Sequence, residues 1–370
     1  MTTSGFALWI VCVLVCAALL YLIQIPLRKL QKKWPRIIVL IAKFLLCVFI
    51  AFAVMAIDAA IVYRFTFVLS GLYVALFGDI VGDIISLFIE NRGKPESRRK
   101  RQFTAIAICT VIYLLAGTIN MQVVTPHAVN ITTDKVQKTH KFVFFADIQV
   151  GSSQSMKTVE ETIRKIDNED PEFVLIGGDN TDELTTNEEM KQLYALLGTI
   201  DAPVYFIYGN HDYQPTGESF GGRTYTQEEL EEALASNGIN VLKDEWIEWD
   251  DNIVLFGRDD YTSPDRKPIE AVPARPEGSF VIAVDHSPYE TEDIIKSGAD
   301  IQLSGHSHAG QFFPLQALYR LAGYDAYGKF HHGDTDVFVT SGAGGWGVPF
   351  RTEAGCHYEV VTLEPGSQGR

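Results

Sequence analysis

The sequence predicts a helical membrane region followed by an α/β domain, and three observations support this fold class. The first 124 residues contain four long apolar runs, whereas the rest of the chain alternates short apolar runs with helical patterns. The charge divides at the same place, because residues 1–124 hold 13 basic and 5 acidic residues and residues 125–370 hold 18 and 41. We therefore expect a transmembrane region at 1–124, a linker at 125–140 and a folded domain at 141–370.

Four transmembrane helices are expected in the first region, because an apolar run of about 20 residues spans the hydrocarbon core of a bilayer. The runs lie at 6–25, 37–63, 65–89 and 103–124. A cleaved signal peptide is the alternative for the first run. It fits poorly, since no basic residue precedes this run, no small-residue cleavage site is visible, and Arg28 and Lys29 follow it.

Basic residues on two loops predict how the chain crosses the membrane. Residues 28–36 hold five lysines and arginines, and residues 92–101 hold six. Two spans separate these clusters, which places both on the same side, and short basic loops face the cytoplasm. We therefore expect a multi-pass protein of the plasma (inner) membrane whose domain lies on the extracytoplasmic side.

Charged residues inside the apolar runs have two candidate roles. Asp79 and Asp83 lie four residues apart, on one face of the expected third helix. Acidic groups within the membrane often mark functional sites. They can equally hold the helices together by pairing with Lys43 or Arg64, and both alternatives remain open.

The composition argues against two features of the outer domain. Its net negative charge disfavours nucleic acid as a partner, because binding nucleic acid requires basic residues that neutralise phosphates. Four of the five cysteines lie in the expected spans, which leaves Cys356 alone in the domain. One thiol cannot form an internal disulfide, so no disulfide framework is expected.

The domain begins with a βαβαβ pattern, which predicts a sheet with helices packed on it. Buried strands are expected at 142–146, 173–176 and 204–208, with helices at 156–166 and 188–197. A further helix at 227–236 precedes strands at 253–256, 280–284, 301–303, 337–340 and 358–363. About 245 residues are ample for one hydrophobic core.

Residues of the types that commonly bind metals follow five of these strands. The motifs are "ADIQ" with Asp147 and Gln149, "GGDN" with Asp179, "GNHD" with Asn210, His211 and Asp212, "DHSP" with His286, and "GHSH" with His306 and His308. In open α/β sheets, ligands bind at the carboxyl ends of the strands. A single histidine is usually structural, but five such strand ends together predict a metal site.

These motifs resemble the calcineurin-like metallophosphoesterase superfamily. Its pattern is Asp-x-His, Gly-Asp, Gly-Asn-His-Asp/Glu, a lone His and Gly-His-x-His, and the resemblance covers residues 142 to about 363. The stretches "GQFFP" and "VFVTSGAGGWGVPFR" resemble the membrane-anchored bacterial branch of this superfamily. The resemblance implies a β-sandwich flanked by helices and an enzyme that uses two divalent metal ions.

The resemblance also implies a role for each of these residues. It assigns one metal ion to Asp147, Gln149, Asp179 and His308, and a second ion to Asp179, Asn210, His286 and His306. His211 would not bind metal but would face the phosphoryl oxygens, and Asp212 would orient it.

Gln149 departs from the superfamily pattern, which usually has histidine at this position. Its amide oxygen can bind a hard ion, although it lacks the preference of imidazole for zinc, copper and iron. Some diphosphate-cleaving members of the superfamily also carry Asp-x-Gln. We therefore expect Gln149 to be a ligand, with Mn²⁺ as the first expectation for the metal and Mg²⁺, Zn²⁺ or iron as alternatives.

The expected function is hydrolysis of a phosphoester or diphosphate bond by a water that two metal ions activate. Membrane attachment suggests a small-molecule or lipid phosphate of the cell envelope as the substrate. The alternative is a catalytically silent domain that binds metal and regulates the membrane region. Three arginines are weaker candidates, which could bind substrate phosphate or form structural salt bridges: Arg223, Arg258 and Arg351. His331 and His332 could reach the cleft or lie on an exposed loop.

Overall fold

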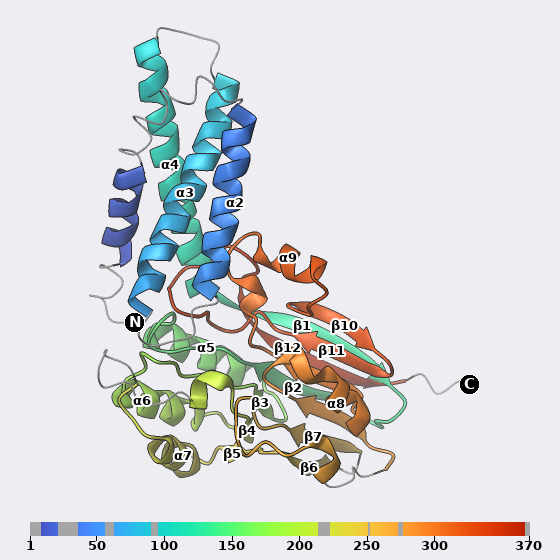
Figure 1. The fold of residues 1–370 in the computed structure, drawn as a ribbon. Helices are drawn as coiled ribbons and strands as arrows, with labels where there is room; N and C mark the ends of the chain where they lie inside the picture. Colours follow the sequence, from blue (N-terminus) through green and yellow to red (C-terminus); the bar gives the residue numbers. More distant parts are fainter. Residues whose placement is uncertain are drawn as a thin grey trace.

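The computed structural model describes residues 9–20, 36–55, 63–89, 95–213, 223–250, 252–272 and 277–366. A bundle of apolar helices stands on a larger domain built from two β-sheets (Figure 1). The predicted fold class, apolar amino-terminal helices followed by an α/β domain, is confirmed.

Three helices of the bundle are long and apolar enough to cross a membrane, namely α2 (Arg36–Met55), α3 (Tyr63–Ile89) and α4 (Pro95–Gln122). The first predicted span is represented by a shorter apolar helix, Trp9–Leu20, and the rest of that run lies outside the described residues. The end of α3 and the start of α4 lie far from the domain, whereas the end of α4 meets it (Figure 1). The predicted orientation requires this arrangement, because it separates the basic start of α4 from the domain.

A buried ion-pair network joins these helices. Lys43 Nζ of α2 lies 2.5 Å from Asp79 Oδ2 and 2.6 Å from Asp83 Oδ2 of α3. From α4, Gln102 Nε2 donates to Asp83 Oδ1 at 2.5 Å. The Lys43 side chain is 12% exposed, so its charge is balanced mainly by the two carboxylates. Of the two predicted roles, the structure therefore shows the pairing with Lys43 that holds the bundle together.

The domain consists of two six-stranded sheets, in the orders β1-β12-β2-β3-β4-β5 and β10-β11-β9-β8-β7-β6. The strands are β1 (Val124–Thr133), β2 (His140–Phe145), β3 (Val174–Ile176), β4 (Val204–Phe206), β5 (Asn240–Val241), β6 (Glu245–Asp250), β7 (Ile253–Gly257), β8 (Phe280–Val284), β9 (Ile301–Ser304), β10 (Gly328–His332), β11 (Thr335–Val339) and β12 (Cys356–Pro365). The helices of the domain are α5 (Met156–Asn168), α6 (Asn187–Leu197), α7 (Gln227–Ser236), α8 (Thr291–Ser297) and α9 (Leu315–Leu321).

The alternation of side chains along the strands builds the layers, because successive residues point to opposite faces of a sheet. In β2, Phe142 and Phe144 pack between the two sheets, whereas Val143 and Phe145 pack against α5, α6 and α7. The other face of the second sheet packs against α8, where Ile294 is fully buried. The domain is thus the predicted β-sandwich with helices on its outer faces.

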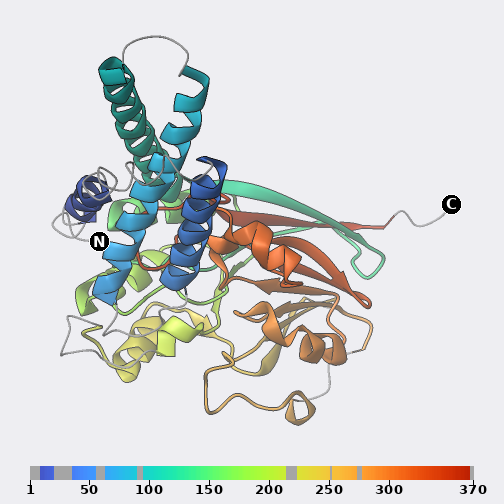
Figure 2. The ribbon, with the colours of Figure 1, turned by 45° about the horizontal axis from the view of Figure 1, so that its top comes forward.

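The predicted linker at 125–140 is wrong over most of its length. Residues 124–133 form β1, which follows α4 almost directly and pairs in parallel with β12 along ten residues. Figure 2 shows these two strands running side by side away from the helix bundle. The strand lies at the edge of its sheet and buries mainly Val124, Val129 and Ile131, so its sequence lacks a continuous apolar run.

One loop of the domain packs against the base of the helix bundle. Trp346 and Phe350 are buried in the same cluster as residues of α2, α3 and α4. Arg351 N donates to the carbonyl oxygen of Gly117 in α4 at 3.1 Å, and a side chain at Gly117 would collide with the Phe350 ring. Tyr73 of α3 donates its hydroxyl to a domain carbonyl at 2.7 Å. Helices and domain are therefore joined by packing and hydrogen bonds rather than by a tether.

The network around Lys43 predicts a stability effect. Lys43→Met should lower the stability of the detergent-solubilised protein by about 3 kcal/mol, because it leaves the buried Asp79 and the half-buried Asp83 carboxylates without their ammonium partner. Thermal unfolding measures the change. The matched control, Lys43→Met with Asp79→Asn and Asp83→Asn, removes all three charges and should recover much of the loss. A melting temperature of Lys43→Met equal to that of the unchanged protein would contradict a stabilising role for this network.

Candidate metal centre

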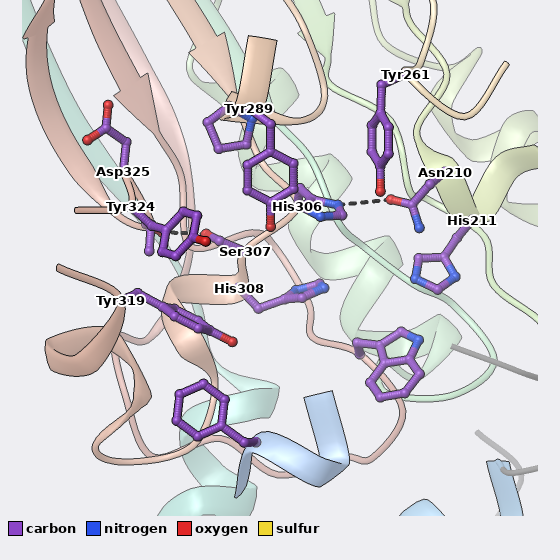
Figure 3. Close-up of a pocket in the computed structure, with 14 residues that line it drawn as sticks. Asn210, His211, Tyr261, Tyr289, His306, Ser307, His308, Tyr319, Tyr324 and Asp325 are labelled. Carbon is purple, nitrogen blue, oxygen red and sulfur yellow. Dashed lines mark hydrogen bonds between the residues drawn. The ribbon is translucent and has the colours of Figure 1, made fainter. Parts of the chain in front are cut away.

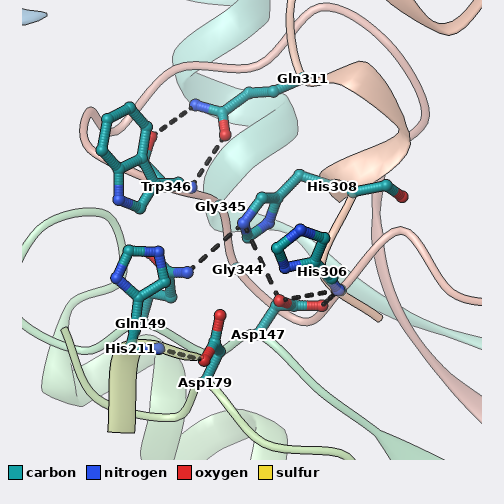
Figure 4. Close-up of polar contacts among 12 residues, drawn as sticks. Asp147, Gln149, Asp179, His211, His306, His308, Gln311, Gly344, Gly345 and Trp346 are labelled. Atoms are coloured by element: carbon teal, nitrogen blue, oxygen red, sulfur yellow. Dashed lines mark hydrogen bonds and ion pairs between the residues drawn. The ribbon is translucent and has the colours of Figure 1, made fainter. Parts of the chain in front are cut away.

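The predicted ligands converge at one edge of the sandwich. In the first sheet β2, β3 and β4 are parallel neighbours, and in the second sheet β8 and β9 are parallel neighbours. Their carboxyl ends therefore deliver the five motifs to one place. Figure 4 shows Asp147, Asp179, His211, His306 and His308 facing one another.

The backbone is strained at five of the predicted ligands. The φ angles are 59° at Asp147, 47° at Gln149, 53° at Asp179, 70° at His306 and 48° at His308. A residue other than glycine in this region costs about 1–3 kcal/mol, and such residues cluster at functional sites.

Asp179, His286 and His306 form a compact group of ligand atoms. One atom from each lies within 4.8 Å of the others, which fits a single metal ion. His286 Nδ1 lies 2.7 Å from the carbonyl oxygen of Gly177, which can only accept, so Nδ1 carries the hydrogen. His286 Nε2 then faces Asp179 Oδ2, 2.9 Å away. At this distance either a proton on Nε2 or a metal ion must lie between the two atoms.

Gln149 supplies a second sign that cations belong here. Its side chain is completely buried, and its Oε1 atom has no hydrogen-bond partner among the described residues. His308 Nε2 lies 3.4 Å from Gln149 Nε2 and 3.8 Å from Asp147 Oδ1. Asp147, Gln149 and His308 thus lie close together, with the amide nitrogen of Gln149 toward His308. A buried amide oxygen without a donor is costly, and a bound ion would remove that cost.

Asn210 joins the second group from the short 3₁₀ helix Asn210–Tyr213. Its Oδ1 atom accepts a hydrogen bond from His306 Nδ1 at 2.9 Å, which leaves His306 Nε2 as the ring atom free to bind metal. The backbone N–H of His306 also donates to both carboxylate oxygens of Asp147, at 3.2 and 3.0 Å. These contacts link the two predicted sets of ligands.

The partner of His211 is Glu183, which the sequence analysis missed. His211 Nδ1 lies 2.8 Å from Glu183 Oε1, and both side chains are buried. The expected partner, Asp212, instead accepts hydrogen bonds from the backbone N–H groups of Asp179 and Gly209 and therefore supports the loops. Glu183 lies in the loop after β3, and no local pattern marks it as a neighbour of the loop after β4.

Burial and mutual repulsion shift the pKa values of the acidic groups in this site. Burial raises the pKa of Asp147 to about 7, and the nearby Asp179 carboxylate adds to the effect. Burial acts the same way on Asp179, but His286 and His211 outweigh it and lower its pKa. Carboxylates so crowded are stabilised by added positive charge, which divalent cations would supply.

The pKa values of His211 and His306 are shifted in opposite directions. Burial alone would lower the pKa of His211, but Glu183 and Asp179 raise it to about 10. Burial and the neighbouring His286 lower the pKa of His306 to about 3. His306 is therefore neutral and suited to bind metal, whereas His211 is suited to carry a proton.

A cavity of about 720 Å³ opens from these ligands toward the membrane helices. Asn210, His211, His306 and His308 line one end (Figure 3). The other walls are mainly aromatic, with Tyr261, Tyr289, Tyr319, Tyr324 and Trp346 from the domain and Phe52 from α2, and they also include Ser307 and Asp325. The sequence could not reveal this cavity, because its walls come from segments that are distant along the chain.

The weaker candidates do not line the cavity. Arg223, Arg258 and Arg351 are each at most 1% exposed. Arg258 pairs with Asp244, and Arg351 donates to backbone carbonyl groups. His331 and His332 lie on β10, where they contact Asp336 and Asp325 rather than the metal-binding residues.

Comparison with known proteins agrees with this geometry. Residues 140–310 match the calcineurin-like phosphoesterase family. An uncharacterized metallophosphoesterase of Helicobacter pylori (strain ATCC 700392 / 26695) is 29% identical over 244 residues, which cover 64% of this chain and 62% of the relative. One from Campylobacter jejuni is 24% identical and covers 79% of both chains. A Danio rerio protein named a transmembrane protein with metallophosphoesterase domain is 28% identical and covers 71% of this chain and 63% of the relative.

The chain thus spans less than two thirds of the length of the Helicobacter pylori relative. The matched segment holds every predicted ligand, from Asp147 to His308, and the fold, the order of the motifs and the relatives agree. Residues 140–310 are thus similar to the calcineurin-like phosphoesterase family, as the motifs predicted, and the curated relatives that the chain resembles include metallophosphoesterases of bacteria and a transmembrane protein with a metallophosphoesterase domain.

Proposed function

We propose that this protein is a metal-dependent hydrolase of phosphoester or diphosphate bonds in amphiphilic substrates at the membrane. The observation that carries the proposal is a single cavity with metal-binding side chains at one end and a transmembrane helix in its wall. The ligands suit a phosphate group and its divalent cations, and the aromatic walls suit an apolar chain.

The donor set fits two divalent cations. Asp147, Gln149, Asp179 and His308 would hold one, and Asp179, Asn210, His286 and His306 would hold the other. The oxygen-rich first set favours Mn²⁺ or Mg²⁺, because amide and carboxylate oxygens are hard ligands. When bound, such ions neutralise phosphoryl charge and lower the pKa of a bound water.

His211 supplies the proton chemistry of the protein itself. Glu183 and Asp179 keep its imidazole protonated, and it lines the cavity at the metal-binding end. A protonated ring there donates a hydrogen bond to a phosphoryl oxygen and can pass its proton to the leaving oxygen. Glu183 fixes the ring from behind, so that Nε2 points toward the substrate.

The shape of the cavity supports a lipid-like substrate. Phe52 lies near the end of α2 and contacts Tyr319 of α9 edge to face, with ring centroids 5.9 Å apart. At the other end, the Tyr289 ring lies 5.3 Å from the His306 ring. A phosphate bound at His306 would therefore have an aromatic path leading to the membrane helix. The predicted orientation would place this site on the extracytoplasmic face.

A panel assay tests the function. Purified full-length protein should hydrolyse phosphoesters or diphosphates when Mn²⁺ or another divalent cation is present, and chelation should abolish turnover. Long-chain lipid substrates should react with higher kcat/KM than water-soluble esters with the same reacting group. Phe52→Ala should lower kcat/KM about tenfold, or ~1.4 kcal/mol, for the long-chain substrate alone.

Two results would count against the proposal in different ways. Absence of hydrolysis with every metal and substrate would favour the silent metal-binding domain instead. Equal loss on both substrate types in Phe52→Ala would leave the hydrolase in place but remove the lipid assignment.

The role of Gln149 is tested by metal binding. Gln149→Ala should weaken one of the two metal ions about 10–100-fold, since a single ligand is lost, and excess Mn²⁺ should restore activity by mass action. Asp179→Asn should weaken both ions, because Asp179 is placed in both sets. If titration of Gln149→Ala with Mn²⁺ matches that of the unchanged protein, Gln149 is a neighbour and not a ligand.

The pair His211–Glu183 should affect turnover without affecting metal content. His211→Ala should lower kcat by roughly 10²–10⁴-fold, the usual contribution of a positioned acid or base. Glu183→Gln should lower kcat less and leave KM nearly unchanged, because the ring stays present but loses its anionic partner. Elemental analysis serves as the control. Loss of metal in His211→Ala would show that His211 is a ligand.

A further inference from the structure

A second cluster of metal-binding side chains lies outside the centre described above, on β1 and β12. His127 of β1 is the register partner of Glu359 of β12, and His357 lies two residues before Glu359. Residues two apart on a strand share one face, so all three side chains meet there. One ligand atom from each lies within 4.8 Å of the others.

The hydrogen bonds of His357 place its second ring nitrogen against a carboxylate. Ser341 Oγ donates its one hydrogen to the carbonyl oxygen of Gly355 at 2.6 Å, so it must accept from His357 Nδ1, 2.9 Å away. With a hydrogen on Nδ1, the other ring nitrogen, Nε2, faces Glu359 Oε1, 3.0 Å away. A proton or a metal ion must lie between these two atoms.

Glu359 is approached by a histidine at each of its oxygens. Besides His357 at Oε1, His127 Nδ1 lies 2.6 Å from Oε2. Glu359 is 4% exposed and His357 5%, whereas the His127 side chain is 55% exposed. The cluster therefore has a buried floor and one side open to solvent. Ligand atoms around a tetrahedral ion at about 2.1 Å lie roughly 3.4 Å apart, which is within the 4.8 Å that separates one ligand atom of each residue from the others.

We propose that His127, His357 and Glu359 bind one Zn²⁺ ion, with water in the fourth position. Two imidazoles and one carboxylate form a donor set that Zn²⁺ accepts readily, and neutral imidazole favours transition metals over Mg²⁺. None of the three residues belongs to the ligands of the phosphoesterase centre. The site would work whatever substrate that centre hydrolyses.

Because the cluster lies across β1 and β12, a bound ion would have a structural role. β1 follows α4 directly, so an ion shared between His127 and the two β12 residues fastens the membrane helix to the sheet. β1 lies at the edge of its sheet and has a neighbouring strand on one side only. Binding to the folded state alone would then stabilise the domain in proportion to the free Zn²⁺ concentration.

Zinc binding to the full-length protein in detergent tests the site. Asp179→Asn serves as the background, because it weakens the phosphoesterase centre and leaves β1 and β12 intact. After chelation, Zn²⁺ alone should bind and raise the melting temperature. Adding His127→Ala should weaken the binding of one Zn²⁺ at least about tenfold and remove most of that rise.

The controls keep a folding defect separate from the loss of a ligand. His127 is mostly exposed, so His127→Ala should keep the metal-free melting temperature, and Glu359→Gln should weaken the same Zn²⁺ by a second route. His331→Ala, at an exposed histidine of β10 that contacts Asp336, should change neither value. Unchanged zinc stoichiometry and affinity in both His127→Ala and Glu359→Gln would overturn the proposal and leave an imidazolium–carboxylate pair.

Discussion

The geometry of the metal centre depends on the buried guanidinium of Arg351. It is fully buried and donates to the carbonyl oxygens of His308, Ser341 and Gly344, at 2.6, 2.7 and 2.9 Å. These are neutral acceptors, and they hold the loop of a predicted ligand against the glycine-rich loop that crosses the site. The backbone N–H of the same residue donates to Gly117 of α4. One side chain and its peptide therefore connect these loops to α4.

Much of the site could be predicted from the sequence, because each ligand follows a short buried strand and the motif is local. Asp179 in "GGDN" and His286 in "DHSP" are found this way, and the parallel strands bring them together. Glu183 could not be found, since its contact with His211 exists only because the loops after β3 and β4 are neighbours. Phe52 could not be predicted for the same reason. It lines the cavity from α2, which is far from His211 in the sequence.

The fold could be predicted to a similar extent. The prediction failed at β1, for a related reason. Strands that are buried on both faces, such as β8 at Phe280–Val284, give continuous apolar runs. β1 does not, because it is an edge strand whose partner, β12, lies more than two hundred residues later in the chain. Its polar sequence resembles a linker when only neighbouring residues are considered. Pairing between strands so far apart in the sequence follows from the topology of the sheet and not from any local pattern.

The membrane helix and the metal centre are connected by a second route besides Arg351. β1 continues from α4 and pairs with β12, and His357 N of β12 donates to the carbonyl oxygen of Gly342 at 3.0 Å. Gly342 in turn packs on Asp147, so closely that an added side chain would crowd the carboxylate. α4 is therefore linked to the predicted metal ligands by two chains of contacts. The position of the cavity wall that α2 forms is fixed separately, because residues of α2 and α3 pack in one buried cluster with Trp346 and Phe350 of the domain.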